Sequence, residues 1–371
     1  MKKFIILALT TLFISACSNS EQDSQRTLYK TAALDIYQWS DYVDPKLIRN
    51  FDNKNKLTTN LSYYDSTESL KTNVINGNAD ADLVVPSIDN VDYFIQSDKF
   101  QKIDKTLIPN HRHIEPALLK LMEQVDPNNE YAVPYFWGIN TIGINKQMVA
   151  QTLGTDTLPE NEWDLVFNPE YTNKLKSCGI SFFDSPSEQY PLVLKYLGKN
   201  PNSELPQDIE AANNLLKTVR PDVKRFSSSG YINDLVNGDL CVAIGFGGDL
   251  NIAKNRAKQS GNNNIVVLVP TTGVGIWIDS FMIPRNAKNV LNAHTYINYM
   301  LDPKIAAQNA NFVTYAPSSK PARALMKKEY AEDASIFVPD DVQAKSFVIL
   351  PKSEETVQLE NKLWTDLKAS K

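Results

Sequence analysis

The sequence predicts an α/β protein whose sheets are mostly parallel and covered by helices on both faces. From Ala32 onward, short and nearly continuous apolar stretches alternate with amphipathic helical patterns. This alternation is typical of proteins in which a helix connects one parallel strand to the next. The 371 residues, 42% of them hydrophobic and 22% charged, provide for an ordinary core. At roughly 150 residues per domain, this length corresponds to about two domains.

The expected elements follow one another along the chain without an internal repeat. Asp44 and Pro45 should start the first helix, because aspartate caps a helix and proline fits its first position. Asp41, in the preceding turn, is then left without a capping role. The expected strands are LDIYQW (34–39), NLSYYD (60–65), ADLVVP (81–86), NTIGIN (140–145), GISFFD (179–184), LCVAIGF (240–246), IVVLVP (265–270) and GIWIDSFMIP (275–284), and the expected helices include 45–56, 68–78, 189–199 and 249–259.

The N-terminus predicts export from the cytoplasm. Two lysines precede a short apolar run, 4–14, and then small residues, as in a secretory signal peptide over residues 1–16. The run is too short to cross a bilayer as a helix; a buried N-terminal helix is the alternative. The sequence ISAC, which ends at Cys17, resembles a bacterial lipobox and implies a lipid on the Cys17 sulfur. We therefore expect a periplasmic lipoprotein tethered to a membrane through residues 17–30.

Three cysteines are an awkward number for an exported protein. If Cys17 carries lipid, Cys178 and Cys241 remain as one pair in an oxidising compartment. A bridge between them would stabilise the fold by roughly 4 kcal/mol in the chain-entropy model. Two buried free thiols are the alternative.

Charge and motifs exclude several classes of function. The net charge of −5 argues against nucleic acid as a partner, which needs a clustered basic face, and is compatible with a cationic ligand. No nucleophile elbow, P-loop or zinc-protease motif is present. His111 and His113 could supply two metal ligands, but such a pair in a polar stretch is more typical of a solvated loop. We therefore expect no catalysis, no cofactor and no metal.

Several expected strands lead directly into a polar turn and then a helix. In open α/β sheets, ligands bind at the turns that follow the carboxyl ends of strands. Four such turns should converge on one crevice, with contributions from Trp39, Ser87, Glu188 and Asp249.

Carboxylates stand beside aromatic rings at these strand ends. A buried alkyl ammonium needs both groups, because carboxylates neutralise its charge and ring faces cover its methylenes. Acids at the two ends of an aromatic slot therefore indicate a receptor for a linear polyamine. The groups are Asp41 between Trp39 and Tyr42, Asp249 after Phe246, and Asp279 after Trp277.

Each of these residues also has a purely structural interpretation. Asp249 could cap the helix that it precedes. Ser185 and Glu188 fit a capping box. Asp279 could face solvent on an alternating strand, and Trp277 could belong to the core.

Five segments carry a resemblance to a known family: IYQWSDYVDP, DADLVVPS, KLKSCGISFFDSPSEQYPLVLKYLGKNPNS, SSSGYINDLVNGDLCVAIGFGGD and WIDSFMIP. They are similar to segments of the extracytoplasmic polyamine-binding proteins of ABC transporters, the receptors for putrescine and spermidine. The resemblance extends from about residue 33 to residue 366.

This resemblance implies the type II periplasmic-binding-protein fold, in which two lobes joined by hinge strands close over a ligand. Residues 31–137 and 262–309 should form lobe 1, and residues 138–261 and 310–371 lobe 2. The resemblance also implies a disulfide between the cysteines at 178 and 241. The implied ligand-binding residues are Trp39, Ser40, Asp41, Tyr42, Ser87, Glu188, Ser228, Phe246, Asp249, Trp277, Asp279 and Tyr315. In the family, the acids at 188, 249 and 279 hold the amines, and the rings at 39, 246 and 277 enclose the alkyl chain.

Four positions bear on which polyamine is bound. Asp89 stands where relatives carry an uncharged residue, and an additional acid there could receive a third amine. Trp277 resembles the spermidine-preferring members, whereas Ile349 is more similar to the putrescine receptors. Phe246 replaces a tryptophan but should still accept methylenes. Together these positions favour spermidine slightly over putrescine.

We therefore expect a monomeric solute-binding protein that delivers a polyamine to the membrane permease of an ABC transporter. One alternative is the same fold binding another cationic solute, such as agmatine, in a sensing role. The other is an extracytoplasmic enzyme that acts on amines.

Overall fold

The computed structural model describes residues 33–64, 67–77 and 80–370. The expected signal peptide, the lipid-bearing Cys17 and the tether lie outside these residues, so all three stay predictions. Within the described ranges, no helix is both long enough and apolar enough to cross a membrane.

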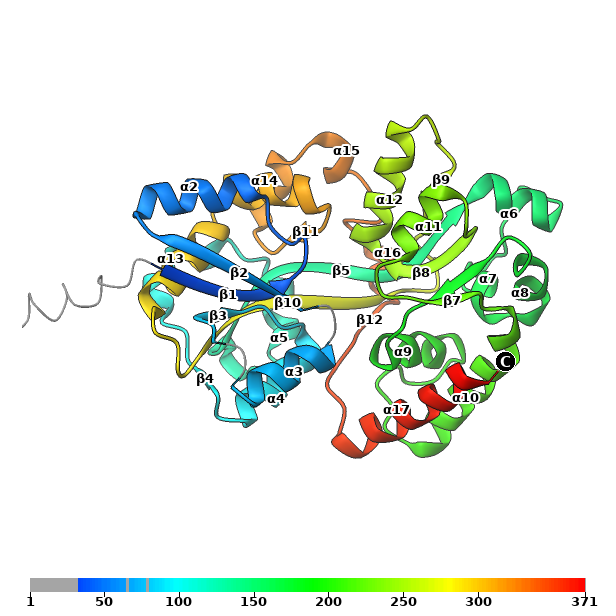
Figure 1. The fold of residues 1–371 in the computed structure, drawn as a ribbon, viewed down its shortest axis with the longest axis horizontal. Coiled ribbons are helices and arrows are strands. Elements are labelled where there is room, and N and C mark those ends of the chain that lie inside the picture. The colour runs from blue at the N-terminus through cyan, green and yellow to red at the C-terminus, as the bar shows by residue number, and fades with distance from the viewer. Residues whose placement is uncertain (1–32, 65–66, 78–79, 371) are drawn as a thin grey trace, which may run out of the picture.

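A mixed sheet, with 12 strands in the described part of the chain, runs through the molecule (Figure 1). Its main path is β2 (Thr58–Tyr64), β1 (Ala33–Trp39), β3 (Leu83–Val84), β10 (Gly275–Pro284), β5 (Ala132–Asn145), β8 (Val242–Phe246), β6 (Ile180–Phe182) and β7 (Arg225–Phe226). The short strands β4 (Phe100–Gln101) and β12 (Phe347–Val348) pair with β10, and β9 (Ile265–Val267) and β11 (Ala316–Pro317) pair with β5. The predicted α/β class is confirmed.

The strand pairings are parallel toward both edges of the sheet and antiparallel in its centre. β1 is parallel to β2 and β3, and β6 is parallel to β7 and β8. The long strands β5 and β10 are antiparallel to each other and to the neighbours that connect them to the two parallel groups. The expectation of mostly parallel pairing therefore holds within each group and is wrong for the central pair.

Helices on both faces of the sheet complete two lobes, and β5 and β10 run from one lobe to the other (Figure 1). Lobe 1 contains α2 (Pro45–Asn55), α3 (Thr67–Ile75), α4 (Ile88–Gln96), α5 (Pro116–Met122), α13 (Val290–Met300) and α14 (Pro303–Val313). Lobe 2 contains α6 (Lys146–Leu153), α7 (Asp164–Phe167), α8 (Pro169–Leu175), α9 (Pro186–Tyr196), α10 (Pro206–Val219), α11 (Tyr231–Asn237), α12 (Gly247–Gln259) and α17 (Glu354–Ala369). The one-turn helices α15 (Lys328–Ala331) and α16 (Asp340–Gln343) lie near the junction.

The packing bears on where the last lobe boundary falls. Ala310, Tyr315 and Met326 are buried in the same core cluster as Leu34 of β1. Val338, in contrast, is buried in the core cluster of lobe 2. The predicted division of the chain stays a prediction, and this packing favours a last crossing after Met326 over one at residue 309.

The turn after β1 satisfies two different local requirements. Asp44 is the N-cap of α2 and accepts a hydrogen bond of 2.9 Å from the Lys46 amide, with Pro45 at the first helical position, as predicted. Asp41 has a φ of 55°. This left-handed conformation is unfavourable for most residues and is tolerated by aspartate. Asp41 therefore has a structural role that the sequence pattern did not reveal.

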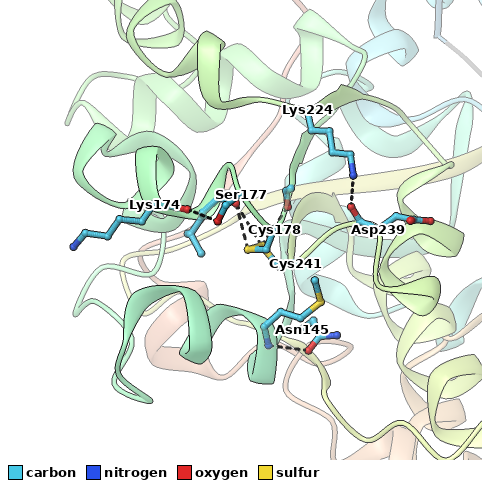
Figure 2. The surroundings of a disulfide bond; sticks show 10 residues. Asn145, Lys174, Ser177, Cys178, Lys224, Asp239 and Cys241 are labelled. Atoms are coloured by element: carbon cyan, nitrogen blue, oxygen red, sulfur yellow. Dashed lines mark hydrogen bonds between the residues drawn. A yellow bond between two sulfur atoms is a disulfide. The ribbon is translucent and has the colours of Figure 1, made fainter.

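The disulfide between Cys178 and Cys241 is present, which confirms that prediction (Figure 2). Cys178 lies just before β6 and Cys241 directly before β8, and these two strands are parallel neighbours. The bridge thus joins the amino ends of both strands. Their carboxyl ends lead into α9 and α12, which carry Glu188 and Asp249.

Candidate ligand-binding site

Four carboxylates come together where the lobes meet. Asp89, Glu188 and Asp249 lie in the first turns of α4, α9 and α12. Asp279 lies in the middle of β10. It forms an antiparallel bridge with Ser87, which lies between β3 and α4. The charge of Asp89 raises the pKa of both Glu188 and Asp279, which shows that these three acids are near one another.

Asp279 is a buried acid held by neutral donors. Its side chain accepts a hydrogen bond of 2.6 Å from the Tyr42 hydroxyl, and it is 5% exposed. Burial raises its pKa to about 7, although the hydrogen bonds from Tyr42 and Ser87 oppose this shift. The interpretation of Asp279 as a solvent-facing strand residue is therefore wrong.

Glu188 projects toward β5 and does not form a capping box. The side-chain amide of Asn140 donates a hydrogen bond to its carboxylate. Ser185 occupies the N-cap position of α9, but its hydroxyl contacts Ser187 and makes no capping hydrogen bond. Burial, followed by the charge of Asp89, raises the pKa of Glu188 to about 8. The hydrogen bond from Asn140 acts in the opposite direction.

Asp249 is held by two tyrosines. Tyr231 donates to one carboxylate oxygen at 2.9 Å, and Tyr315 donates to the other at 2.8 Å. Phe246, not Asp249, occupies the N-cap position of α12, so the interpretation of Asp249 as a cap is wrong. Burial raises the pKa of Asp249, and both tyrosine hydrogen bonds lower it.

Asp89 forms an acidic group with Glu188 and an acid that the sequence analysis did not select. Glu68, exposed on α3, raises the pKa of both Asp89 and Glu188 by its charge. Burial is the main reason why the pKa of Asp89 rises to about 6, and the charge of Lys71 partly opposes that shift. The Asn90 amide donates to Asp89 at 2.7 Å.

Aromatic rings line the same region. The Trp277 ring lies 5.0 Å from that of Tyr315 and is perpendicular to Phe246 at 6.2 Å. Trp39 packs on Tyr64 with centroids 4.5 Å apart. Gly138 makes room for Trp277, because a Cβ there would lie 2.4 Å from its ring. Trp277 is also part of the core of lobe 1, so its structural interpretation holds as well.

The predicted residues are not equally well placed. Tyr42, Ser87 and Asp279 are in contact, as are Phe246, Trp277 and Tyr315, and Tyr315 also holds Asp249. Ser40 and Asp41 are exposed in the turn after β1, and Asp41 acts on Asp249 by raising its pKa. Ser228 is partly exposed in the loop before α11.

Four relevant residues were not predicted: Glu68, Asn140, Tyr64 and Tyr231. Asn140 and Tyr231 hold two of the acids, and they lie 48 and 18 residues from their partners in sequence. Asn140 lay within the expected strand 140–145, and Tyr231 within a segment that carries the family resemblance. Neither signal pointed to a contact with an acid.

Among the described residues, none of these acids is paired with a cation, although the charges of Lys71 and Arg256 lower the pKa values of Asp89 and Asp249. Within the part of the chain that the structure describes, no lysine or arginine forms an ion pair with any of the four carboxylates. No cluster of histidine, cysteine or acidic side chains among the described residues could hold a metal ion. The site is therefore a group of acids without paired cations, bordered by aromatic rings and neutral hydrogen-bond donors.

Comparison with known proteins identifies the class. A family model described as bacterial extracellular solute-binding protein matches residues 46–338, and the chain belongs to this family. The fold agrees with that of a solved structure, the putative spermidine/putrescine ABC transporter from Listeria monocytogenes, with a TM-score of 0.82 and 29% identity. That match covers 92% of this chain and 100% of the other.

Two relatives are more similar in sequence. The putrescine-binding periplasmic protein PotF of Escherichia coli (strain K12) is 39% identical over 340 residues, which cover 91% of this chain and 92% of the relative. The putrescine-binding periplasmic protein SpuD of Pseudomonas aeruginosa (strain UCBPP-PA14) is 36% identical over the full length of both chains. The predicted resemblance is confirmed, and the chain is a solute-binding protein rather than an enzyme.

Proposed function

We propose that this protein is a periplasmic receptor of an ABC importer that binds a linear polyamine between its lobes. The observation that carries the proposal is the set of acids without paired cations: Asp89, Glu188, Asp249 and Asp279. Burying a carboxylate without a counter-charge is costly. A ligand that brings ammonium groups to these positions would supply the missing charge.

The arrangement suits the shape of a polyamine. The charge of Asp89 raises the pKa of Glu188 and Asp279, and that of Asp279 raises the pKa of Glu188, so these three acids form one group, whereas Asp249 is held separately by its two tyrosines. Trp277, which contacts both Phe246 and Tyr315, provides apolar surface for methylenes. A chain with ammonium groups at both ends would satisfy the two acidic positions together.

Spermidine is our preferred ligand, with putrescine close behind. The third acid of the larger group, Asp89, would receive the additional amine of a triamine. The similar proteins are named for putrescine alone or for spermidine with putrescine, which supports this pair of candidates. Ligand-driven closure of the lobes would then present the polyamine to the permease. We further propose that the receptor acts as a monomer, anchored through a lipid on Cys17.

A thermal-shift panel of amines, amino acids and sugars tests the ligand class. A ligand that binds the folded state raises the unfolding temperature by an amount that grows with the ratio of its concentration to its Kd. We expect stabilisation by putrescine and spermidine and none by neutral amino acids or sugars. Stabilisation by amino acids without stabilisation by either polyamine would contradict the proposal.

A further inference from the structure

Tyr231 connects the aromatic wall of the site with one of its acids. It is the first residue of α11 and is fully buried in the core of lobe 2. Its hydroxyl donates to Asp249 at 2.9 Å and accepts a hydrogen bond of 3.1 Å from the Phe246 amide. A single phenol oxygen therefore contacts both the carboxylate and the backbone of the ring residue three positions earlier.

The backbone beneath Tyr231 accommodates its ring closely. A Cβ at Gly245 would lie 2.6 Å from the ring, well inside van der Waals contact, so any larger residue there must displace Tyr231. On another side, Phe183 meets the ring edge-on at 6.5 Å. These contacts fix the position of the hydroxyl, and through it the positions of Asp249 and the Phe246 amide.

We infer that Tyr231 is a positioning residue for polyamine binding: it orients the Asp249 carboxylate and the Phe246 backbone for the ligand without touching the ligand itself. This inference rests on the proposed function. A carboxylate oxygen has two lone pairs. Tyr231 donates to one oxygen of Asp249 and Tyr315 donates to the other. Each oxygen therefore keeps a second lone pair that neither tyrosine uses. An ammonium group could use both.

The two phenols also keep Asp249 available in its charged form. Burial and the charge of Asp41 raise the pKa of Asp249, and Arg256 lowers it from a distance. The hydrogen bonds from Tyr315 and Tyr231 are the larger of the opposing influences. Loss of the Tyr231 donor should therefore raise the pKa of Asp249 and weaken binding most at low pH.

The primary test is Tyr231→Phe, which keeps the ring and removes the hydroxyl. Calorimetric titration with putrescine and with spermidine should show affinity reduced by about tenfold or more, as expected for a lost hydrogen bond to a charged group. The loss should be larger at pH 6 than at pH 8. Carboxyl NMR on the ligand-free variant should show that Asp249 titrates at a higher pH than in the wild type.

Tyr196→Phe is the matched control. Tyr196, in the same lobe, donates a hydrogen bond of 2.6 Å to Asp164, so this change also removes one tyrosine–aspartate bond. It should leave the affinity, its pH profile and the Asp249 titration unchanged. Wild-type affinity and an unshifted Asp249 titration in Tyr231→Phe would overturn the inference.

Two further experiments cover the cases in which the protein binds no polyamine or the Tyr231→Phe variant does not fold. If wild-type protein binds neither polyamine, the proposed function fails, and the Asp249 titration alone still decides whether Tyr231 positions this carboxylate. If Tyr231→Phe does not fold, Gly245→Ala takes its place, because the added Cβ displaces the ring while the hydroxyl remains. A folded Gly245→Ala protein with unchanged polyamine affinity would equally contradict the inference.

Discussion

Tyr42 donates a hydrogen bond of 2.6 Å to Asp279, across 237 residues of sequence. The contact joins the turn after β1 to the long strand that crosses between the lobes. A phenol satisfies one lone pair of the carboxylate but brings no positive charge, so the acid stays short of a counter-charge. The same pattern, an acid with a neutral donor, recurs at Glu188 and Asp249.

Asp249→Asn and Asp279→Asn should each weaken binding of putrescine and spermidine by more than about tenfold, because each substitution leaves a desolvated ammonium group of the ligand without its counter-charge. Calorimetric titration measures the change. Asp302→Asn is the control, since asparagine also caps a helix and Asp302 caps α14 away from the acids. Unchanged affinity in both site variants would refute the assignment of the acids.

Glu188→Gln should weaken polyamine binding while stabilising the ligand-free protein at high pH. The pKa of Glu188 is raised from 4.5 to about 8, so between these values the folded state binds more protons than the unfolded state. The free energy of unfolding therefore falls as the pH rises through this range. The variant should show a shallower fall and a higher Tm at pH 8.

Thermal unfolding from pH 5 to pH 9 checks this expectation. Glu210→Gln, at an exposed position of α10 in the same lobe, should reproduce the wild-type profile. A Glu188→Gln protein whose stability follows the wild-type pH dependence would show that Glu188 is not desolvated in the free receptor.

Asp89→Asn should change selectivity. If Asp89 receives the third amine, its loss should weaken spermidine binding by about tenfold and leave putrescine binding unchanged or tighter. Competition titrations of the two polyamines give the affinity ratio directly. Asp92→Asn, on the same helix, is the control. An unchanged ratio in Asp89→Asn would remove the structural argument for spermidine.

Removing the disulfide should reduce stability and spare binding. The bridge joins the amino ends of β6 and β8, and the site residues follow their carboxyl ends. Replacing Cys178 and Cys241 with alanine should lower the free energy of unfolding by about 4 kcal/mol in the chain-entropy model. Denaturant titration measures this loss. A large loss of polyamine affinity in the folded variant would contradict the expectation that the bridge, at the amino ends of the strands, does not affect the site residues that follow their carboxyl ends.

Local signals predicted the helices and the polar turns well. Asp44 and Pro45 start α2 because capping depends on neighbouring residues. The strand β5 was only half predicted: Pro134 interrupts its pattern, and a register shift opposite Asp279 and Ser280 accommodates the proline in the sheet. Pro134 is a local sign of an irregularity, but whether a strand continues past it depends on the partner strand, which the local sequence does not reveal.

The acids of the site could be selected from the sequence, but their partners could not. Carboxylates beside aromatic rings at strand ends stand out in any α/β sequence. Asn140, which holds Glu188, and Tyr231, which holds Asp249, look like ordinary strand and helix residues. Only the folded arrangement places their donors beside the acids. Asp41 differs from these two residues, because it was selected from the sequence as a binding residue. Its left-handed turn conformation gives it a structural role as well, which the sequence did not show.

The most direct test of polyamine binding by these acids is calorimetric titration of the wild-type protein at pH 7 in two buffers with different ionisation enthalpies. Without ligand, the pKa of Glu188 is about 8 and that of Asp279 about 7, so both are partly protonated. An ammonium beside them favours the charged form and releases protons. We predict saturable binding of putrescine and spermidine with a buffer-dependent heat. The absence of saturable heat with either polyamine in both buffers would contradict the account.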